Sequence, residues 1–513
     1  MTLAYVWALP LAVASFGLQV RPRWRNRYFG IDTWRHLAVA DFYRRRRCDP
    51  HATFDRYLID EPSDYPPVLR WLLSLLSRTW VERSQWFICP LIDLAHNLLL
   101  FGVAYTLTQD VGAALAAQAA YLLAPLIVME NSSLTTRPLA SLLFSGLMLL
   151  NLRFAVTGEW VWLPASMAAG TLLFLTHRMS IQALTALTVI LTAWFRTPYY
   201  AAALLGGWGL AVAVSRGFYW RVFTGHLAML AWWRQNIHHR YAHQVRGLPR
   251  QREESADPVF RIYQLVRRAP FVAVFAANPF VLCALALTFD RAFHLGVTRA
   301  PAWDAELELV LVWAVGLLAV GLAVRQFRFL EFAGEGERYG EYAAFPSALA
   351  AAALLVVVSP DWRWAVWTGL SALGLFGGLL PALYLQQKVV ARDTDRSLTP
   401  SLRQVLGTLE AAPAPARLMT VPLALADFAL YFTARTRVLS TDSSFGHLRH
   451  YSDFWPVLRV PITTIFARYA IDTLLVNEQY VRLDELHLPE ALVTQREGQF
   501  CLVRVDGLKE SPG

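Results

Sequence analysis

Long apolar stretches dominate this chain and most constrain how it can fold. About eleven of them approach or exceed the roughly 18 to 20 residues that cross a bilayer as a helix. The 513-residue chain is 56% hydrophobic and 17% charged, whereas a soluble domain carries about 25% charged residues. The sequence therefore predicts an α-helical polytopic membrane protein. The expected spans lie near residues 2–20, 85–108, 111–129, 137–155, 161–176, 179–195, 199–215, 270–290, 305–324, 346–359 and 363–388.

The sequence pattern changes after residue 390. Thr399 followed by Pro400 is typical of a helix start. Strands are expected at 417–421, 437–439 and 473–476, a helical stretch near 424–433, and a closing hairpin at 491–505. Because strands alternate with helices, we expect a small extramembranous α/β domain. The predicted organisation is a transmembrane domain over 1–390 and a soluble C-terminal domain over 391–513.

The charge balance limits the classes of partner. The net charge is +9 and almost all of the basic residues are arginines, which suit lipid headgroups and phosphates. No soluble basic domain is large enough to recognise nucleic acid, so no nucleic-acid partner is expected. The four cysteines are scattered without a common spacing, and they indicate neither a zinc site nor a disulfide framework.

The first polar loop, residues 21–66, contains the most suggestive group. Asp32 and His36 are four residues apart, which places both on one face of a short helix, with Arg35 between them. A solvated loop helix is the plain alternative. The loop also carries four consecutive arginines at 44–47, for which a solvated or headgroup-facing patch is the plain interpretation. It ends in "DEPSDYPP", which contains Asp64 and Tyr65.

Alternation of the expected spans places three further polar motifs on the same membrane face as Asp32. Charge gathered at one face favours chemistry at the membrane surface, whereas a transporter favours polar groups at mid-membrane in broken helices. The motifs are "ENSSLTTRP" with Glu130 and Arg137, "LLFLTHRMS" with His177 and Arg178, and "GERYGEYAAFP" with Arg338 and Tyr342.

The order of these motifs resembles that of the C-type membrane glycosyltransferases, the GT-C superfamily. The resemblance rests on an aspartate in the loop after the first helix, on "YPP" before the next hydrophobic stretch, and on "GERYGEYAAFP" before a late span. The superfamily includes oligosaccharyltransferases, protein O-mannosyltransferases and the lipid A aminoarabinose transferase. The resemblance covers roughly residues 1–390 and, more weakly, the C-terminal domain.

The resemblance implies a GT-C-like catalytic membrane domain and a defined reaction. A sugar would pass from a polyprenyl-phosphate donor to a glycan, lipid or protein acceptor at the extracytoplasmic face. Asp32 would be the general base, and His36 would orient Asp32 or the substrate. His177, Arg178 and Arg338 would bind the lipid phosphate, and Glu130 and Arg137 would border the cavity. The further substrate-binding candidates are Arg35, Asp64, Tyr65 and Tyr342.

The sequence departs from the metal-dependent members of this superfamily. Asp32 is followed by Thr33 and Trp34, so the Asp-x-Asp motif of those members is missing. We therefore expect a metal-independent enzyme without a cofactor. A divalent metal held by Asp60, Glu61 and Asp64 is the alternative.

Two inferences about topology disagree. Arginines at 21, 23, 25, 27 and 44–47 would place the motif face in the cytoplasm by the positive-inside rule. The resemblance instead places this face and the C-terminal domain outside a bacterial inner membrane, and we adopt that expectation. Two other functions stay open, namely an O-antigen-ligase-like transferase, which would gather its arginines in one large late loop, and a lipid or polysaccharide transporter.

Overall fold

The computed structural model describes residues 2–240, 242–247, 261, 269–439 and 445–508. Between the expected spans 199–215 and 270–290, residues 241, 248–260 and 262–268 lie outside the described residues. The chain forms two compact units. The membrane unit comprises residues 1–27, 85–217 and 255–392, and the loop–sheet unit comprises residues 28–84, 218–254 and 393–513. The second unit thus combines the C-terminal segment with two segments from the first 390 residues.

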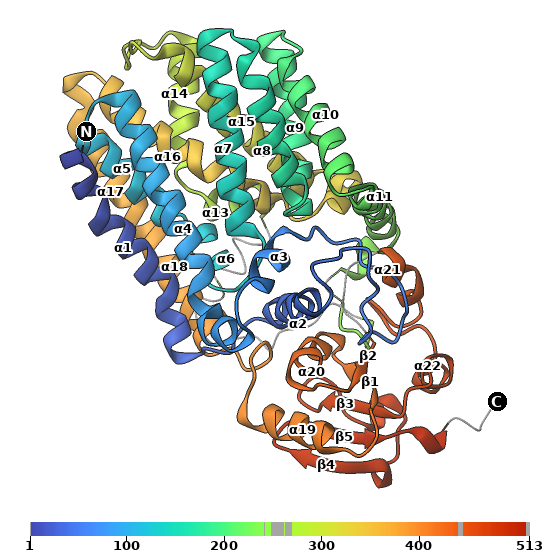
Figure 1. Ribbon diagram of the computed structural model, residues 1–513. Helices are drawn as coiled ribbons and strands as arrows, with labels where there is room; N and C mark the ends of the chain where they lie inside the picture. The colour runs from blue at the N-terminus through green and yellow to red at the C-terminus, as the bar shows by residue number, and fades with distance from the viewer. Residues whose placement is uncertain (1, 241, 248–260, 262–268, 440–444, 509–513) are drawn as a thin grey trace. The chain divides into compact units, whose positions relative to one another are not determined.

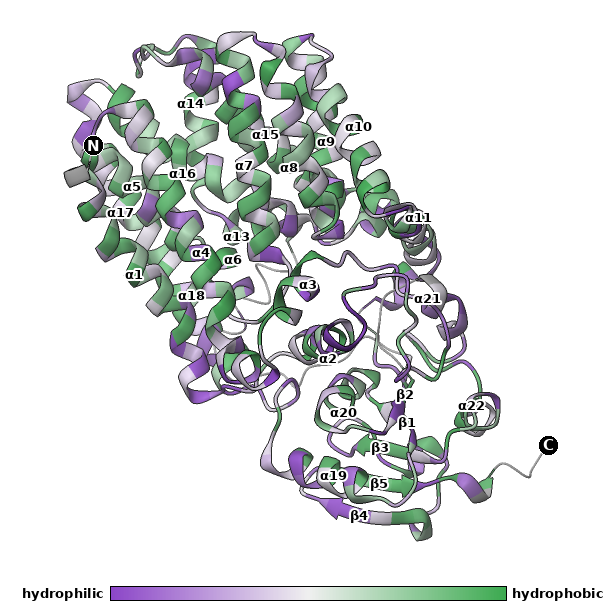
Figure 2. Cartoon of the chain, viewed as in Figure 1, coloured by the Kyte–Doolittle hydropathy of each residue, from purple (hydrophilic) through white to green (hydrophobic). Residues whose placement is uncertain are grey.

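Apolar helices make up the membrane unit (Figures 1 and 2). Six helices in the described part of the chain are long and apolar enough to cross a membrane, or seven if one bent pair forms a single span. The expected total of about eleven spans stays a prediction. The helices are α1 Thr2–Arg25, α4 Arg78–Thr108, α5 Val111–Leu122, α6 Pro125–Glu130, α7 Arg137–Thr157, α8 Leu163–Phe174, α9 Arg178–Phe195, α10 Tyr199–Val214, α13 Pro270–Ala277, α14 Val281–Phe293, α15 Asp304–Gln326, α16 Tyr339–Val357, α17 Arg363–Ala372 and α18 Leu380–Leu385.

Two of the expected spans are broken, and for these the prediction of one continuous helix was wrong. The 111–129 segment divides into α5 and α6 just before Pro125. The 270–290 segment divides into α13 and α14, with a bend of 109°, at Asn278 and Pro279. Proline has no backbone N–H and its ring clashes with the preceding turn, so a helix tends to stop before it.

Helix α16 is the most enclosed element of the membrane unit. Its most apolar window is 89% buried, and it packs against α5, α14 and α15. The alanines at 350–353 let neighbouring helices approach closely. The helical segment over residues 360–391, by contrast, is only 17% buried. Residues in the first turn of α16 are therefore fixed by packing on several sides.

The polar residues inside α4 face the interior and hydrogen-bond there. Tyr121 donates to the Asp93 carboxylate at 2.7 Å and lies 2.8 Å from the His96 ring nitrogen. Asn97 accepts a hydrogen bond from Gln118 at 2.7 Å. Buried polar groups in a membrane helix are costly unless paired in this way.

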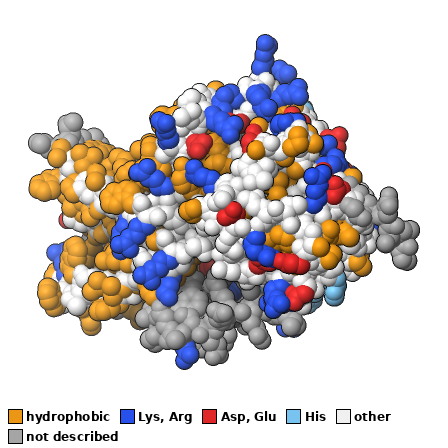
Figure 3. All heavy atoms as spheres, turned by 90° about the horizontal axis from the view of Figure 1, so that it is seen from below, with side chains coloured by type: hydrophobic (Ala, Val, Ile, Leu, Met, Phe, Trp, Pro, Cys, Tyr) orange, Lys and Arg blue, Asp and Glu red, His pale blue; other side chains and the backbone are white. Residues whose placement is uncertain are grey.

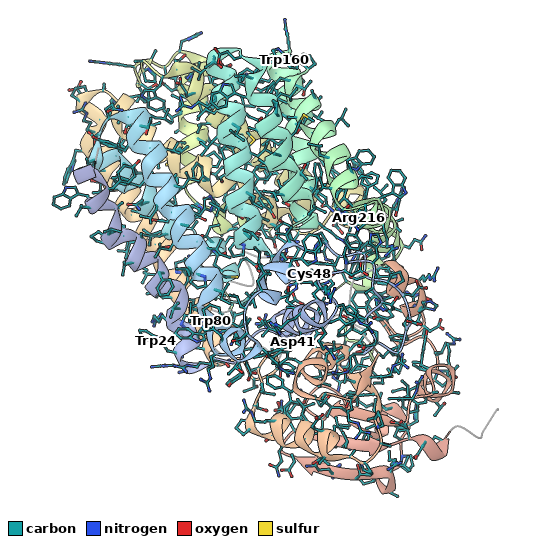
Figure 4. All side chains as sticks on the ribbon, viewed as in Figure 1. Trp24, Asp41, Cys48, Trp80, Trp160 and Arg216 are labelled. Carbon is teal, nitrogen blue, oxygen red and sulfur yellow. The ribbon has the colours of Figure 1, made fainter. Side chains whose placement is uncertain are left out.

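Exposed tryptophans lie at both ends of the bundle. Figure 4 labels Trp24 at one end and Trp160 at the other, and these side chains are 68% and 50% exposed. Tryptophan is favoured at the two interfaces of a bilayer. Together with the apolar helices, this arrangement is that of an integral multi-pass membrane protein.

A five-stranded sheet organises the loop–sheet unit, in the order β2-β1-β3-β5-β4. Strands β2 and β3 pair with β1 in parallel, and β5 is antiparallel to β3 and β4. The Thr399 side chain accepts from the Leu402 N–H, which confirms the predicted helix start. The elements are α2 Ile31–Arg45, α3 Val68–Ser74, α11 Phe218–Asn236, α19 Pro400–Ala411, β1 Arg417–Val421, α20 Ala426–Phe432, β2 Arg437–Val438, α21 Phe445–Tyr451, α22 Ile462–Tyr469, β3 Thr473–Asn477, β4 Val493–Glu497 and β5 Phe500–Arg504.

The first loop folds together with this sheet. Tyr57 forms a parallel bridge with Val438 of β2, and Leu58 donates to the Val438 carbonyl at 2.8 Å. On α2, Trp34 packs against Phe432 of α20, with ring centroids 4.7 Å apart. Trp232 of α11 joins the buried core of the same unit. The helix that carries Asp32 is therefore positioned by the C-terminal part of the chain.

Candidate functional site

Asp32 lies in the first turn of α2, where the helix dipole favours a negative charge. The helix begins after Gly30, whose φ of 103° is accessible to glycine at little cost. The Asp32 side chain is 59% exposed, and Arg35 Nη2 lies 2.8 Å from its Oδ1. The structure thus holds an accessible carboxylate in a fixed direction through an arginine one turn later.

His36 of α2 and Arg70 of α3 are buried and lie beside the partly exposed Tyr65. Arg70 Nε donates to His36 Nδ1 at 3.3 Å, and its guanidinium lies 4.5 Å from the centre of the Tyr65 ring. Arg70 is fully buried. Within the described residues its two terminal nitrogens have no hydrogen-bond partner. A buried guanidinium with free donors favours an anion or a polar group nearby.

The carboxylates considered as metal ligands have other neighbours. Glu61 forms an ion pair with Arg449. Asp64 is 3% exposed and lies against α11, where a Cβ on Gly225 would come 2.0 Å from its Oδ2. No group of three or more His, Cys, Asp or Glu side chains in the described part of the chain is placed to hold a metal ion. Metal independence stays a prediction.

In the membrane unit, Glu130 lies between two arginines. It forms an ion pair with Arg137 at the start of α7, and its Oε1 is 3.4 Å from Arg338 Nη1. Arg137 is also 3.8 Å from Glu341 in the first turn of α16. The sequence predicted that Glu130, Arg137 and Arg338 share a face, and these contacts bring the three side chains together.

A second pair adjoins this cluster. His177 Nδ1 lies 3.0 Å from the Tyr342 hydroxyl, and Trp313 donates to the Tyr342 carbonyl at 3.0 Å. Arg178, 5% exposed, opens α9 directly after His177. The starts of α7, α9 and α16 therefore meet here, and each contributes the partial positive charge of a helix N-terminus.

Sequence reasoning missed two residues of these groups. Arg70 is the only charged residue of α3, and an arginine in a short apolar helix after "YPP" was a usable signal. Glu341 lies in "GERYGEYAAFP" between the two residues that were chosen. Its spacing from Arg338 and Tyr342 did not reveal that it would contact Arg137, because that contact joins two distant segments.

The fold can be compared with solved structures. The chain is similar to ArnT from Cupriavidus metallidurans bound to undecaprenyl phosphate, with a TM-score of 0.55, 15% identity and 99% of each chain covered. It is also similar to the oligosaccharyltransferase AglB from Archaeoglobus fulgidus in complex with an inhibitory peptide and a dolichol-phosphate. That match has a TM-score of 0.55, 10% identity, and covers 92% of this chain and 69% of the other. No protein-family profile and no curated protein sequence matches the chain.

Proposed function

We propose that this chain, which has the fold of the GT-C membrane glycosyltransferases, transfers a sugar from a polyprenyl-phosphate donor to an acceptor at the extracytoplasmic face. The observation that carries the proposal is Asp32. In a chain of this fold, an accessible carboxylate stands at the start of a helix directly after the first membrane helix. Structures of two proteins with this fold contain dolichol-phosphate or undecaprenyl phosphate.

In the proposed reaction Asp32 is the general base. It takes the proton of the acceptor hydroxyl while that oxygen bonds to the anomeric carbon of the sugar. The bond from this carbon to the phosphate oxygen breaks, and the polyprenyl phosphate leaves with the electron pair. The Arg35 contact fixes the carboxylate before the substrate arrives, so that little reorganisation is needed. The step needs no metal or cofactor.

Cations must hold the phosphate as its charge develops. Arg338 already contacts Glu130 and Glu335, and these carboxylates would compete with a phosphate. His177 and Arg178 lie at the start of α9, where the helix dipole favours an anion. Of the three predicted phosphate ligands, we therefore assign the main role to Arg178 and His177, assisted by the helix N-termini around them.

The alternatives receive less support. A transporter would be expected to have broken helices in corresponding positions of two halves. Within the described residues the broken spans are α5–α6 and α13–α14, whereas the charged groups of the candidate site lie at the starts of α2, α7, α9 and α16. For an O-antigen-ligase-like transferase we expected the charged groups in one large late loop, whereas Asp32 follows the first helix.

The test is Asp32→Asn in the purified full-length protein. We expect the transfer rate to fall at least about 100-fold, because loss of a general base typically costs 10²- to 10⁴-fold. The side chain is 59% exposed, so the thermal unfolding temperature should change little. Asp55→Asn is the matched control, since Asp55 is an exposed aspartate of the same loop. Full transfer by the Asp32→Asn protein would refute the assignment.

A further inference from the structure

A separate pocket lies in the loop–sheet unit, at the far end of α2 from Asp32. Its volume is about 240 Å³. The last turns of α2, the following loop, the start of α4 and the end of α20 contribute its walls. Figure 4 labels Asp41, one of the lining residues, on α2. From Asp32 to Asp41 and Arg45 the helix rises about 14 to 20 Å, so the pocket is distinct from the candidate base.

The pocket carries a strong positive charge. Arg44, Arg45, Arg56 and Arg78 line it, against the single carboxylate of Asp41. Figure 3 shows Lys and Arg side chains over much of the visible face, so surface charge alone does not distinguish this place. The distinguishing feature is that four arginines of one unit converge on one cavity.

Backbone carbonyl groups hold three of these arginines in place. Arg44 donates to the carbonyls of Leu73 and Ser74. Arg56 Nε donates to the Thr436 carbonyl at 2.7 Å, and Arg78 Nη2 to the Tyr431 carbonyl at 2.9 Å. A guanidinium has five N–H donors, so these bonds fix the side chains and leave other donors for a ligand.

The carboxylates near the pocket do not pair with every arginine. Asp41 forms ion pairs with both Arg44 and Arg78, whereas Glu82 and Glu410 accept hydrogen bonds from the Tyr431 hydroxyl and the Ala434 N–H. Arg45 is exposed and, within the described residues, has neither a hydrogen bond nor an ion pair. Burial lowers the pKa of Arg56 to about 10, opposed by nearby Asp55 and reinforced by Arg45. Arg56 thus stays charged at neutral pH without being fully compensated.

We propose that this pocket binds a phosphate group of the acceptor. Converging guanidinium groups match a phosphate in charge and geometry. Phe54 and Tyr431 are buried in the wall of the same cavity, and the Arg78 guanidinium lies 4.8 Å from the centre of the Tyr431 ring. The assignment of this phosphate to the acceptor rests on the proposed function. The donor phosphate must lie near the reacting atoms, whereas this pocket lies at the far end of α2 from Asp32.

The experiment measures binding of glucose 1-phosphate to the full-length protein in detergent, by calorimetry, with glucose as the neutral probe. Arg45→Gln is the test variant, because Arg45 is exposed and has no structural partner to lose. Arg47→Gln is the matched control, since Arg47 is an exposed arginine two residues later that does not line the pocket. Loss of a charge-assisted hydrogen bond should weaken binding about tenfold in Arg45→Gln and leave the control unchanged.

A second arm separates a sugar phosphate from a lipid headgroup. The same variants are titrated with vesicles of phosphatidylglycerol and of phosphatidylcholine. Preference for glucose 1-phosphate over glucose, lost in Arg45→Gln alone, supports the proposal. Equal affinities of the two variants overturn it, as does binding that appears only with phosphatidylglycerol vesicles. Asp32→Asn should bind the probe normally, so a failure of the proposed reaction stays distinguishable from a failure of this site.

Discussion

At the level of single residues, the hydrogen bond from Arg70 to His36 determines which ring nitrogen carries the proton. Arginine can only donate, so His36 Nδ1 must accept. The imidazole is then neutral, with its proton on Nε2, and it can donate a hydrogen bond from that atom. His36 is therefore suited to orienting a substrate oxygen and unsuited to acting as a base through Nδ1.

Two substitutions test this assignment. The side-chain amide of glutamine reaches the place of Nε2, whereas that of asparagine reaches the place of Nδ1. We expect His36→Gln to keep a transfer rate about tenfold above that of His36→Asn, which corresponds to one hydrogen bond. The measurement is kcat and KM for both variants. An asparagine variant as active as the glutamine variant would contradict the assigned proton position.

The residues of the candidate site were predictable only in part. Asp32 and His36 are separated by one helical turn, and a local pattern of this kind can be seen in a single sequence. Arg70 contacts His36 across 34 positions, and Arg137 contacts Glu341 across more than 200. Such contacts depend on how distant segments pack, so the sequence alone did not show which partners Arg70 and Glu341 would contact.

Among the elements, the turn before α16 must approach the backbone of α15 closely in order to position Arg338. This turn, Gly336–Arg338, packs against α15. A Cβ on Gly336 would lie 2.1 Å from the Gly321 carbonyl oxygen of α15. Two glycines thus allow the turn to lie directly on the helix, and Arg338 and the start of α16 follow from that contact.

Gly336→Ala should therefore separate the turn from α15. We expect a loss of about 1–3 kcal/mol of stability, which is typical of overpacking, together with weaker transfer through displacement of Arg338. Gly369→Ala in α17 is the control, since a Cβ there meets nothing within 4 Å, and it should be neutral or stabilising. Thermal unfolding in detergent measures both. Similar unfolding temperatures for the two variants would refute the close-packing argument.

Helices were predicted best where a single local property of the sequence determines their position. Hydropathy located the membrane helices, and the Thr399 cap located α19. Pro125 and Pro279 are visible in the sequence. Because apolar residues continue on both sides of each proline, hydropathy does not show that the helix ends and changes direction there. The pairing of Tyr57 with Val438 leaves no local pattern, and for this reason the first loop was not expected to belong to the same unit as the C-terminal sheet.

For the whole molecule, the distribution of arginines between the two membrane faces needs a structural account. Arg23 is fully buried and donates to the carbonyls of Ser132 and Arg27, at 2.6 and 2.7 Å. Arg44 is likewise bound to carbonyl groups. Arginines used in this way bind the protein's own backbone, which gives them a structural role whatever their effect on orientation.

Cysteine labelling of intact cells tests the proposed orientation. Single cysteines replace Ser133, Thr157 and Thr408 in a chain without the four native cysteines. Ser133 precedes α7 and Thr157 is its last residue, so the two positions should differ in accessibility from outside. We expect labelling at Ser133 and at Thr408 on α19, and protection at Thr157. The reverse pattern would place the candidate site in the cytoplasm and exclude a donor presented at the outer face.

The shared sheet of the loop–sheet unit also has a consequence for biogenesis. Arg56 and Thr436 contact each other across 380 positions, so the ribosome finishes the first loop long before its partner strand exists. During most of translation the first loop therefore lacks its packing partners. These partners are synthesised only with the last hundred or so residues. A nascent chain arrested before α19 would contain the membrane helices α1 to α18 and would lack the segment against which the helix of Asp32 packs, so we expect no transfer until that segment is made.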